Sequence, residues 1–146
     1  MKISILKKVS TEELRDIQEL LNQLSGKPEG HSAIKLKTVE GMVSDAKTLL
    51  VVARNEAHIV GMGMIGVIQD FDGPAGHIDN VVVLDTYRGQ GIGEEICKEL
   101  IALARKKKLM EIDLTSRPSR IAANKLYQKL GFELRETNVY RMKLDS

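Results

Sequence analysis

The feature that most constrains this chain is a glycine-rich turn between an apolar run and a helical pattern. The turn, Arg88-Gly89-Gln90-Gly91-Ile92-Gly93, closely follows the consecutive valines Val81, Val82 and Val83. A run that is apolar on both faces predicts a strand in the centre of a sheet. Apolar residues then recur at helical spacing from Ile92 to Ala104. The sequence therefore predicts a strand, a turn and a helix, and free N–H groups at a helix start can bind an anion.

The rest of the chain reads as short strands alternating with helices. Strands are expected at 2–9, 48–53, 58–68, 77–84 and 110–114, and a closing hairpin at 132–144. Helices are expected after Ser10, from Leu36, from Ile92 and around Tyr127, with a loop at 69–76. Strands 77–84 and 110–114 are joined by a helix, so they should be parallel and adjacent. The expected fold class is α+β, with a mixed, mostly antiparallel sheet of six to seven strands flanked by about four helices.

Local signals support three of these elements. Ser10 followed by Glu13 is a capping box that starts the first helix. Gly61, Gly63 and Gly66 in one strand predict a bulge or a close backbone neighbour. Gly131 is the expected end of the last helix.

Composition excludes several classes of protein. A length of 146 residues suits a single domain over 1–146, and 22 basic against 20 acidic residues give a net charge of +2, too balanced for a nucleic-acid partner. The lone Cys97 excludes an intrachain disulfide, and the three histidines lack metal-ligand spacing, so no metal is expected. No apolar run reaches the roughly 20 residues of a membrane helix. A cytoplasmic protein follows, and a homodimer is left open.

Two nucleotide-binding motifs can be compared with the glycine turn. A Walker loop needs a Lys-Ser/Thr pair, which is absent from this turn. The dinucleotide fingerprint fits at Gly89 and Gly91, but Glu94 stands in the place of its third glycine. Asp113 lies near the distance expected for a ribose-binding acid. A dinucleotide site, and a tight turn without any ligand, therefore stay open as alternatives.

Two segments resemble one family. Val83 to Gly93 resembles the acetyl-CoA motif of the GNAT N-acetyltransferase superfamily, Arg/Gln-x-x-Gly-x-Gly/Ala after a valine-bearing strand. Ala123-Asn124-Lys125-Leu126-Tyr127-Gln128-Lys129-Leu130-Gly131-Phe132 resembles the family's asparagine-and-tyrosine helix that ends in Gly-Phe. The two motifs have the family's order and spacing, and the resemblance covers nearly the whole chain.

The resemblance implies a direct acetyl transfer from acetyl-CoA to a primary amine of a small molecule or peptide. It implies that the amides of Arg88, Gly89, Gln90, Gly91, Ile92 and Gly93 hold the pyrophosphate, that Val81, Val82 and Val83 pair with the pantetheine arm, and that Asn124 contacts CoA. The strands 77–84 and 110–114 would splay apart to admit the thioester. Tyr127 is implied as the proton donor to the departing thiolate, against the alternative that it only packs in the core.

The sequence says less about the residues that bind and deprotonate the acceptor amine. Asp79 is the candidate base, with His77 on the same strand face, against the alternative of a strand-end carboxylate. Residues 76–83 resemble glucosamine-phosphate N-acetyltransferases, which carry an acidic residue at the position of Asp79. The segment 116–123 differs, because it is longer than the corresponding segment of those enzymes. The acceptor is expected to contact residues 25–35 and 69–76. A non-catalytic CoA- or dinucleotide-binding module is the alternative function.

Overall fold

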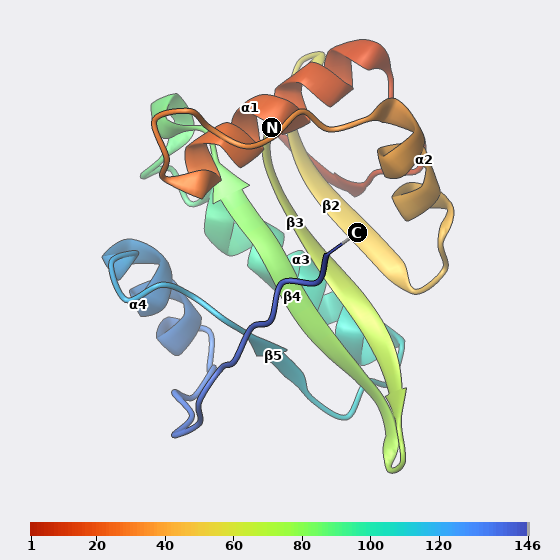
Figure 1. The fold of residues 1–146 in the computed structure, drawn as a ribbon, viewed down its shortest axis with the longest axis vertical. Helices are drawn as coiled ribbons and strands as arrows, with labels where there is room; N and C mark the ends of the chain where they lie inside the picture. Colours follow the sequence, from red (N-terminus) through yellow and green to blue (C-terminus); the bar gives the residue numbers. More distant parts are fainter. Residues whose placement is uncertain (146) are drawn as a thin grey trace. The chain divides into compact units, whose positions relative to one another are not determined.

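The structure, a computed structural model, describes residues 1–145 and divides into two compact units, Met1–Thr115 and a smaller unit that begins at Ser116 (Figure 1). The first unit contains β1 (Lys2–Ile5), α1 (Thr11–Ser25), α2 (Leu36–Ser44), β2 (Thr48–Asn55), β3 (His58–Asp70), β4 (Gly73–Val83), the 3₁₀ turn η1 (Asp85–Tyr87), α3 (Ile92–Lys106) and β5 (Ile112–Leu114). The second unit contains α4 (Ile121–Lys129).

The strands form one mixed sheet in the order β1-β2-β3-β4-β5. The pairs from β1 to β4 are antiparallel, and β5 is parallel to β4, as the sequence predicts for strands joined by a helix. The α+β class is therefore confirmed. The predicted number of six to seven strands is wrong for the described residues, which form five.

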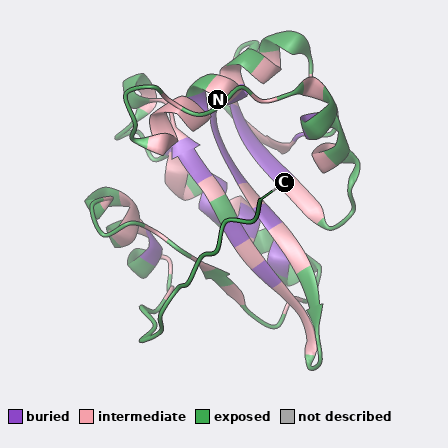
Figure 2. Cartoon of the chain, viewed as in Figure 1, coloured by how far each residue is buried: buried purple, intermediate pink, exposed green. Residues whose placement is uncertain are grey.

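Helices cover both faces of this sheet. On one face α1 packs on β3 and β4, and α2 packs on β2. The core under these two helices is built from apolar side chains that are nearly inaccessible to solvent: Leu6, Ile17, Leu20, Val39, Leu50, Val52, Ile59, Met62 and Val82. Figure 2 shows the buried residues concentrated along the central strands. This core fixes α1 and α2 over one end of the sheet face.

On the other face α3 lies directly on the glycines of β3. A Cβ on Gly61 would come within 3.0 Å of Ile96, and one on Gly63 within 2.9 Å of Ile96 and 3.0 Å of Leu100. These distances are shorter than most Cβ contacts in proteins, so a side chain would force α3 to shift, and the two glycines let α3 approach the backbone of the sheet. The predicted close neighbour is confirmed, and the register of β3 against β4 also shifts between Met62 and Met64.

The segment 69–76 was expected to be a loop, and this is wrong. Pairing of β3 with β4 extends to Asp70 and Gly73, so only Phe71 and Asp72 form the turn. The backbone N–H of Phe71 donates to Oδ1 of Asp70 at 2.7 Å, which stabilises the tight connection. The Asp and Gly residues of 69–76 that suggested a loop are common in hairpin turns as well.

The expected closing hairpin at 132–144 is also wrong, because residues 132–145 contain neither helix nor strand. The alternating apolar side chains that suggested it are exposed: Tyr140 is 88% exposed, Met142 82% and Leu144 82%. An isolated two-stranded hairpin gains little stability unless one face is buried. Without such burial, alternation alone does not make a strand.

The predicted capping box is present at the start of α1. The backbone N–H of Glu13 donates to Oγ of Ser10 at 3.1 Å, and the backbone N–H of Ser10 donates to Oε1 of Glu13 at 3.1 Å. The other carboxylate oxygen, Oε2, accepts from Nη2 of Arg54 at 2.6 Å. Burial raises the pKa of Glu13, but the hydrogen bonds from Arg54 and Ser10 and the Arg54 charge outweigh it and hold the pKa below its ordinary value.

Replacing Glu13 by glutamine should therefore lower the free energy of unfolding at pH 7 by about 1–3 kcal/mol. Because the folded pKa of Glu13 is lowered, its contribution is complete above the unfolded value and is lost as pH falls through the folded value. Denaturant unfolding at pH 7 and in acid should show the gap between wild type and variant closing in acid. Glu12→Gln, an exposed change in the same helical turn, is the control, and equal stability of both variants at pH 7 would contradict the prediction.

Candidate functional site

The glycine turn has a backbone that only glycine adopts easily. Gly89 has a φ of +78° and Gly91 a φ of +81°, both in the left-handed region. A Cβ on either residue would meet no atom within 4 Å, so the space over the turn is open. Gly91 is the N-cap of α3 and makes no side-chain capping hydrogen bond. The turn therefore presents backbone amides of a helix start to an open surface, an arrangement suited to phosphate.

The turn is held in place from several sides. Ile92, the first residue of α3, is 6% exposed and packs toward Gly61. Before the turn, the backbone N–H of Asp85 donates to Oε1 of Gln23 at 2.9 Å. Nδ2 of Asn55 donates to the hydroxyl of Tyr87, also at 2.9 Å. These contacts tie the approach to the turn to α1 and β2.

Arg88 and Gln90 are exposed, and Gly93 lies in the first turn of α3. Nε of Arg88 donates to the carbonyl oxygen of Val83 at 3.0 Å, so the guanidinium stays beside the end of β4. Glu94 and Glu95 occupy the first turn of α3, and Nζ of Lys98 lies 3.0 Å from Oε2 of Glu94. Their position suits the helix dipole, as expected.

Strands β4 and β5 are paired over a short stretch. The pairs are Gly76 with Ile112, His77 with Asp113 and Ile78 with Leu114, whereas β4 continues to Val83. Val81 and Val82 lie in this continuation, 8% and 3% exposed. The residues predicted to pair with the pantetheine arm are thus on the part of β4 beyond its pairing with β5.

The middle of β4 contains a bulge that the sequence reading did not place there. Asn80 has a φ of +56°, at the point where the register against β3 shifts. Its Nδ2 donates to Sδ of Met64 at 3.3 Å. Bulges of this kind redirect side chains and are frequent beside active sites. Here the bulge separates Asp79 from the valines that follow it.

Asp79 and His77 lie on the same face of β4, as the alternation of a strand predicts. Asp79 is exposed, and its Oδ1 accepts the backbone N–H of Asn80 at 2.9 Å. His77 forms a contact that the sequence did not reveal: its Nδ1 lies 2.7 Å from Oδ1 of Asp113 on β5. His77 and Asp113 are far apart in the sequence, and the parallel register makes them neighbours.

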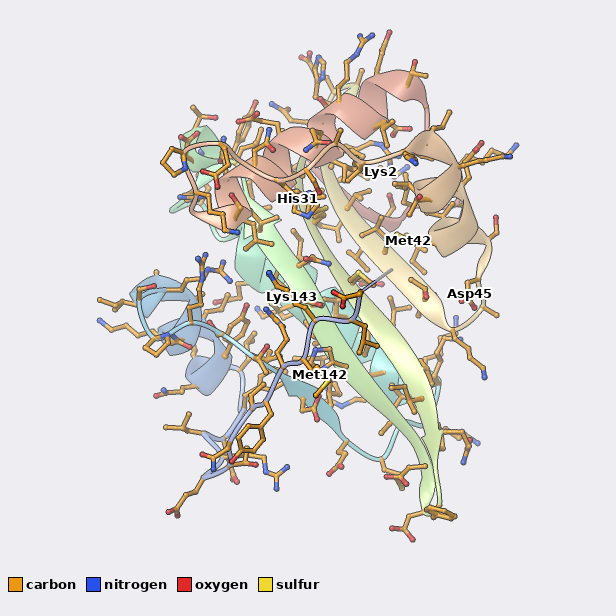
Figure 3. All side chains as sticks on the ribbon, in the orientation of Figure 1. Lys2, His31, Met42, Asp45, Met142 and Lys143 are labelled. Atoms are coloured by element: carbon orange, nitrogen blue, oxygen red, sulfur yellow. The ribbon has the colours of Figure 1, made fainter. Side chains whose placement is uncertain are left out.

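Two side-chain amides of α1 hold the connection between α1 and α2, within the segment expected to contact the acceptor. Oδ1 of Asn22 accepts the backbone N–H of His31 at 2.9 Å, and Oε1 of Gln18 accepts that of Ile34 at 2.8 Å. Nε2 of Gln18 donates to the carbonyl oxygen of His31 at 3.2 Å. Figure 3 shows His31 on this connection, which the two amides fix to α1.

The remaining predicted residues belong to the second unit. Tyr127 is 6% exposed, and its ring lies 6.0 Å from that of Phe132 in an edge-to-face arrangement. Nδ2 of Asn124 donates to the carbonyl oxygens of Arg117 at 3.0 Å and Arg120 at 2.9 Å, which supports the start of α4. Both residues are well held within this unit, and their roles toward CoA and the reacting sulfur stay predictions.

Residues 1–145 contain neither a cluster of metal-ligating side chains nor a helix able to span a membrane. No group of three or more histidine, cysteine or acidic side chains there is arranged to hold a metal ion. Within the same residues, no helix has the length and apolarity needed to cross a membrane. Cys97 is buried in α3.

Comparison with known families gives a match over most of the chain. Residues 13–132 match the model of the acetyltransferase (GNAT) family. This range contains the glycine turn, Asp79, the β4–β5 pair and the motif around Tyr127.

Individual relatives point the same way. The chain is 36% identical over 70 residues to a glucosamine 6-phosphate N-acetyltransferase of Trypanosoma brucei brucei, an alignment that covers 48% of this chain and 44% of that enzyme. It is 31% identical over 130 residues to glucosamine 6-phosphate N-acetyltransferase 1 of Oryza sativa subsp. japonica, covering 82% of this chain and 77% of that one. The solved structure of a Trypanosoma brucei acetyltransferase superposes with a TM-score of 0.75 at 28% identity, over 99% of both chains.

Proposed function

The chain belongs to the acetyltransferase (GNAT) family, and on this basis we propose that it moves the acetyl group of acetyl-CoA directly to a primary amine of a small molecule or peptide. The observation that carries the proposal is the glycine turn at the start of α3, with Gly89 and Gly91 at positive φ under open space. A pyrophosphate needs this close approach to backbone amides. We further propose that both units act together as one acetyltransferase domain and that the reaction takes place in the cytoplasm.

Acetyl-CoA is proposed to bind along β4 and the glycine turn. The amides from Arg88 to Gly93 hold the pyrophosphate, and the Arg88 guanidinium adds positive charge beside it. The backbone of Val81 to Val83 pairs with the pantetheine arm in the manner of an added strand. Asn124 is the proposed further contact to CoA. No metal takes part in this proposal.

The chemical step needs an uncharged amine, a polarised thioester carbonyl and a proton for the departing sulfur. We assign the proton donor to Tyr127, because a phenol hydroxyl can donate its proton to a departing sulfur beside it. A backbone N–H near Val83 is the proposed donor to the thioester carbonyl. Asp79, exposed beside the bulge, is proposed to act on the acceptor amine as its base or its counter-ion.

The acceptor class is proposed from the relatives. Both curated relatives described above act on glucosamine 6-phosphate, a sugar amine. A sugar amine is therefore the first acceptor to test, followed by a peptide with a free N-terminus. The competing function is a module that binds CoA or a dinucleotide without catalysis.

Acetyl-CoA should raise the melting temperature of the protein, because a ligand that binds only the folded state stabilises it. At about 100 times its Kd, the added stability should be roughly 2.7 kcal/mol. Differential scanning calorimetry with acetyl-CoA, CoA and NAD at matched concentrations would measure the effect. Stabilisation by NAD without stabilisation by CoA would favour the dinucleotide alternative and overturn the proposal.

A further inference from the structure

We propose that His77, aligned by Asp113, removes the proton from the acceptor's ammonium group before the amine attacks acetyl-CoA. The inference rests on the proposed acetyl transfer and adds the residue that makes the amine nucleophilic. Nδ1 of His77 lies 2.7 Å from Oδ1 of Asp113. The two residues are direct partners in the parallel register of β4 and β5, so the backbone of the sheet sets their spacing.

The contact with Asp113 determines which ring nitrogen is available. An ionised carboxylate only accepts hydrogen bonds, so Nδ1 of His77 must donate the proton between them. In the neutral ring, Nε2 then carries the lone pair and is the atom that can take a proton. The side chain of His77 is 43% exposed and that of Asp113 65%, so the ring is accessible while the carboxylate orients it. Asp113 is a positioning residue in this scheme.

The sheet face beside His77 has room for a ligand. Gly66 on β3 is the direct partner of His77 in the antiparallel register. A Cβ on Gly66 would meet no atom within 4 Å, unlike Gly61 and Gly63 on the opposite face. The neighbouring pair on the face of His77 is Met64 with Asp79. An amine that lies over Gly66 would therefore have both His77 and Asp79 beside it.

The chemistry favours the imidazole over the exposed carboxylate as base. A primary amine is protonated at neutral pH, and its ammonium has no lone pair with which to attack. An imidazole takes up a proton near neutral pH far more readily than a carboxylate does, and general bases act best near the working pH. His77 thus takes the proton, and Asp79 serves as the counter-ion of the ammonium.

The protons balance in this scheme. One proton passes from the ammonium to Nε2 of His77 and then to solvent. The amine nitrogen forms a bond to the acetyl carbon, and the carbon–sulfur bond breaks. The sulfur leaves as a thiolate and takes a proton from the general acid, which is reprotonated by the second proton that the nitrogen loses. The products are the acetamide, the CoA thiol and one proton.

The test compares His77→Ala with His58→Ala, because the chain contains a second histidine–aspartate contact. Nδ1 of His58 lies 3.4 Å from Oδ1 of Asp16, and that histidine is 71% exposed. The assay is CoA thiol release from acetyl-CoA with glucosamine 6-phosphate, glucosamine or an N-terminal alanine peptide as acceptor. His77→Ala should lower kcat by about 10²–10⁴-fold with the KM for acetyl-CoA unchanged. Added imidazole should restore part of the rate, and neither effect is expected for His58→Ala.

Each outcome has a defined meaning. Wild-type kcat in His77→Ala, or a loss that imidazole does not restore, overturns the assignment of His77 as base. A loss confined to Asp79→Asn would instead identify Asp79 as the base. If wild-type protein transfers no acetyl group to any amine, the proposed function itself fails.

A second measurement needs no acceptor. Long-range ¹H–¹⁵N correlation spectra report which imidazole nitrogen carries the proton. In the neutral ring of His77 the proton should be on Nδ1, and Asp113→Asn should change that preference. A neutral ring protonated at Nε2 in the wild type would overturn the proposal.

Gly66→Leu, placed in the open space beside the ring, should raise the KM for the acceptor more than the KM for acetyl-CoA.

Discussion

Tyr127→Phe is expected to reduce turnover by about 10²–10⁴-fold if the phenol protonates the departing thiolate. The substitution removes the hydroxyl and keeps the ring, which packs edge-to-face with Phe132 at 6.0 Å. The melting temperature and the affinity for acetyl-CoA should therefore change little. The measurement is kcat for CoA thiol release, under conditions in which chemistry limits the rate.

Tyr140→Phe is the matched control, because Tyr140 is 88% exposed and the change removes the same atom from the same unit. It should leave turnover and stability unchanged. Wild-type turnover in Tyr127→Phe, with any loss confined to stability, would mean that Tyr127 only supports the packing of its helix.

Gly91→Ala is expected to weaken acetyl-CoA binding by roughly 10- to 100-fold, the equivalent of about 1.5–3 kcal/mol for a lost contact to a charged group. A methyl group at Gly91 would occupy the open space over the amides that are proposed to hold the pyrophosphate. Because φ is +81° there, alanine is also strained and should cost about 1–2 kcal/mol of stability.

Gly131→Ala separates these two effects. Gly131 has a φ of +102° and equally open space around its Cβ position, but it lies after α4, outside the glycine turn. Its replacement should lower stability by a similar amount without weakening acetyl-CoA binding, as measured by isothermal titration calorimetry. Equal affinity in wild type and Gly91→Ala would remove the turn from the binding site.

Much of the fold could be predicted because its signals are local. Ser10 and Glu13 form the capping box within one helical turn, and both hydrogen bonds are present. The glycines of β3 predicted a close neighbour, and α3 is that neighbour at Gly61 and Gly63. The parallel pairing of β4 and β5 followed from the helix between them. In each case a short stretch of sequence carries the signal, even where the partner, such as α3 for Gly61 and Gly63, lies further along the chain.

The errors concern segments whose structure is decided by strand pairing and burial, which composition and alternation alone do not show. The alternation of Tyr140, Met142 and Leu144 suggested a strand, but these side chains are exposed and no pairing forms. The composition of residues 69–76 suggested a loop, whereas pairing between strands extends to Asp70 and Gly73. The contact of His77 with Asp113 needs the exact β4–β5 register, which neither residue signals on its own.

The most direct test of the account is transfer of a labelled acetyl group. The protein would be incubated with acetyl-CoA carrying ¹³C in its acetyl group and with glucosamine 6-phosphate, other amino sugars or a peptide with a free N-terminus. Mass spectrometry would follow the label while thiol release is counted. The account predicts labelled acetamide in a one-to-one ratio with CoA thiol. Labelled acetate as the sole product, or acetyl-CoA that stays intact with every amine, would contradict it.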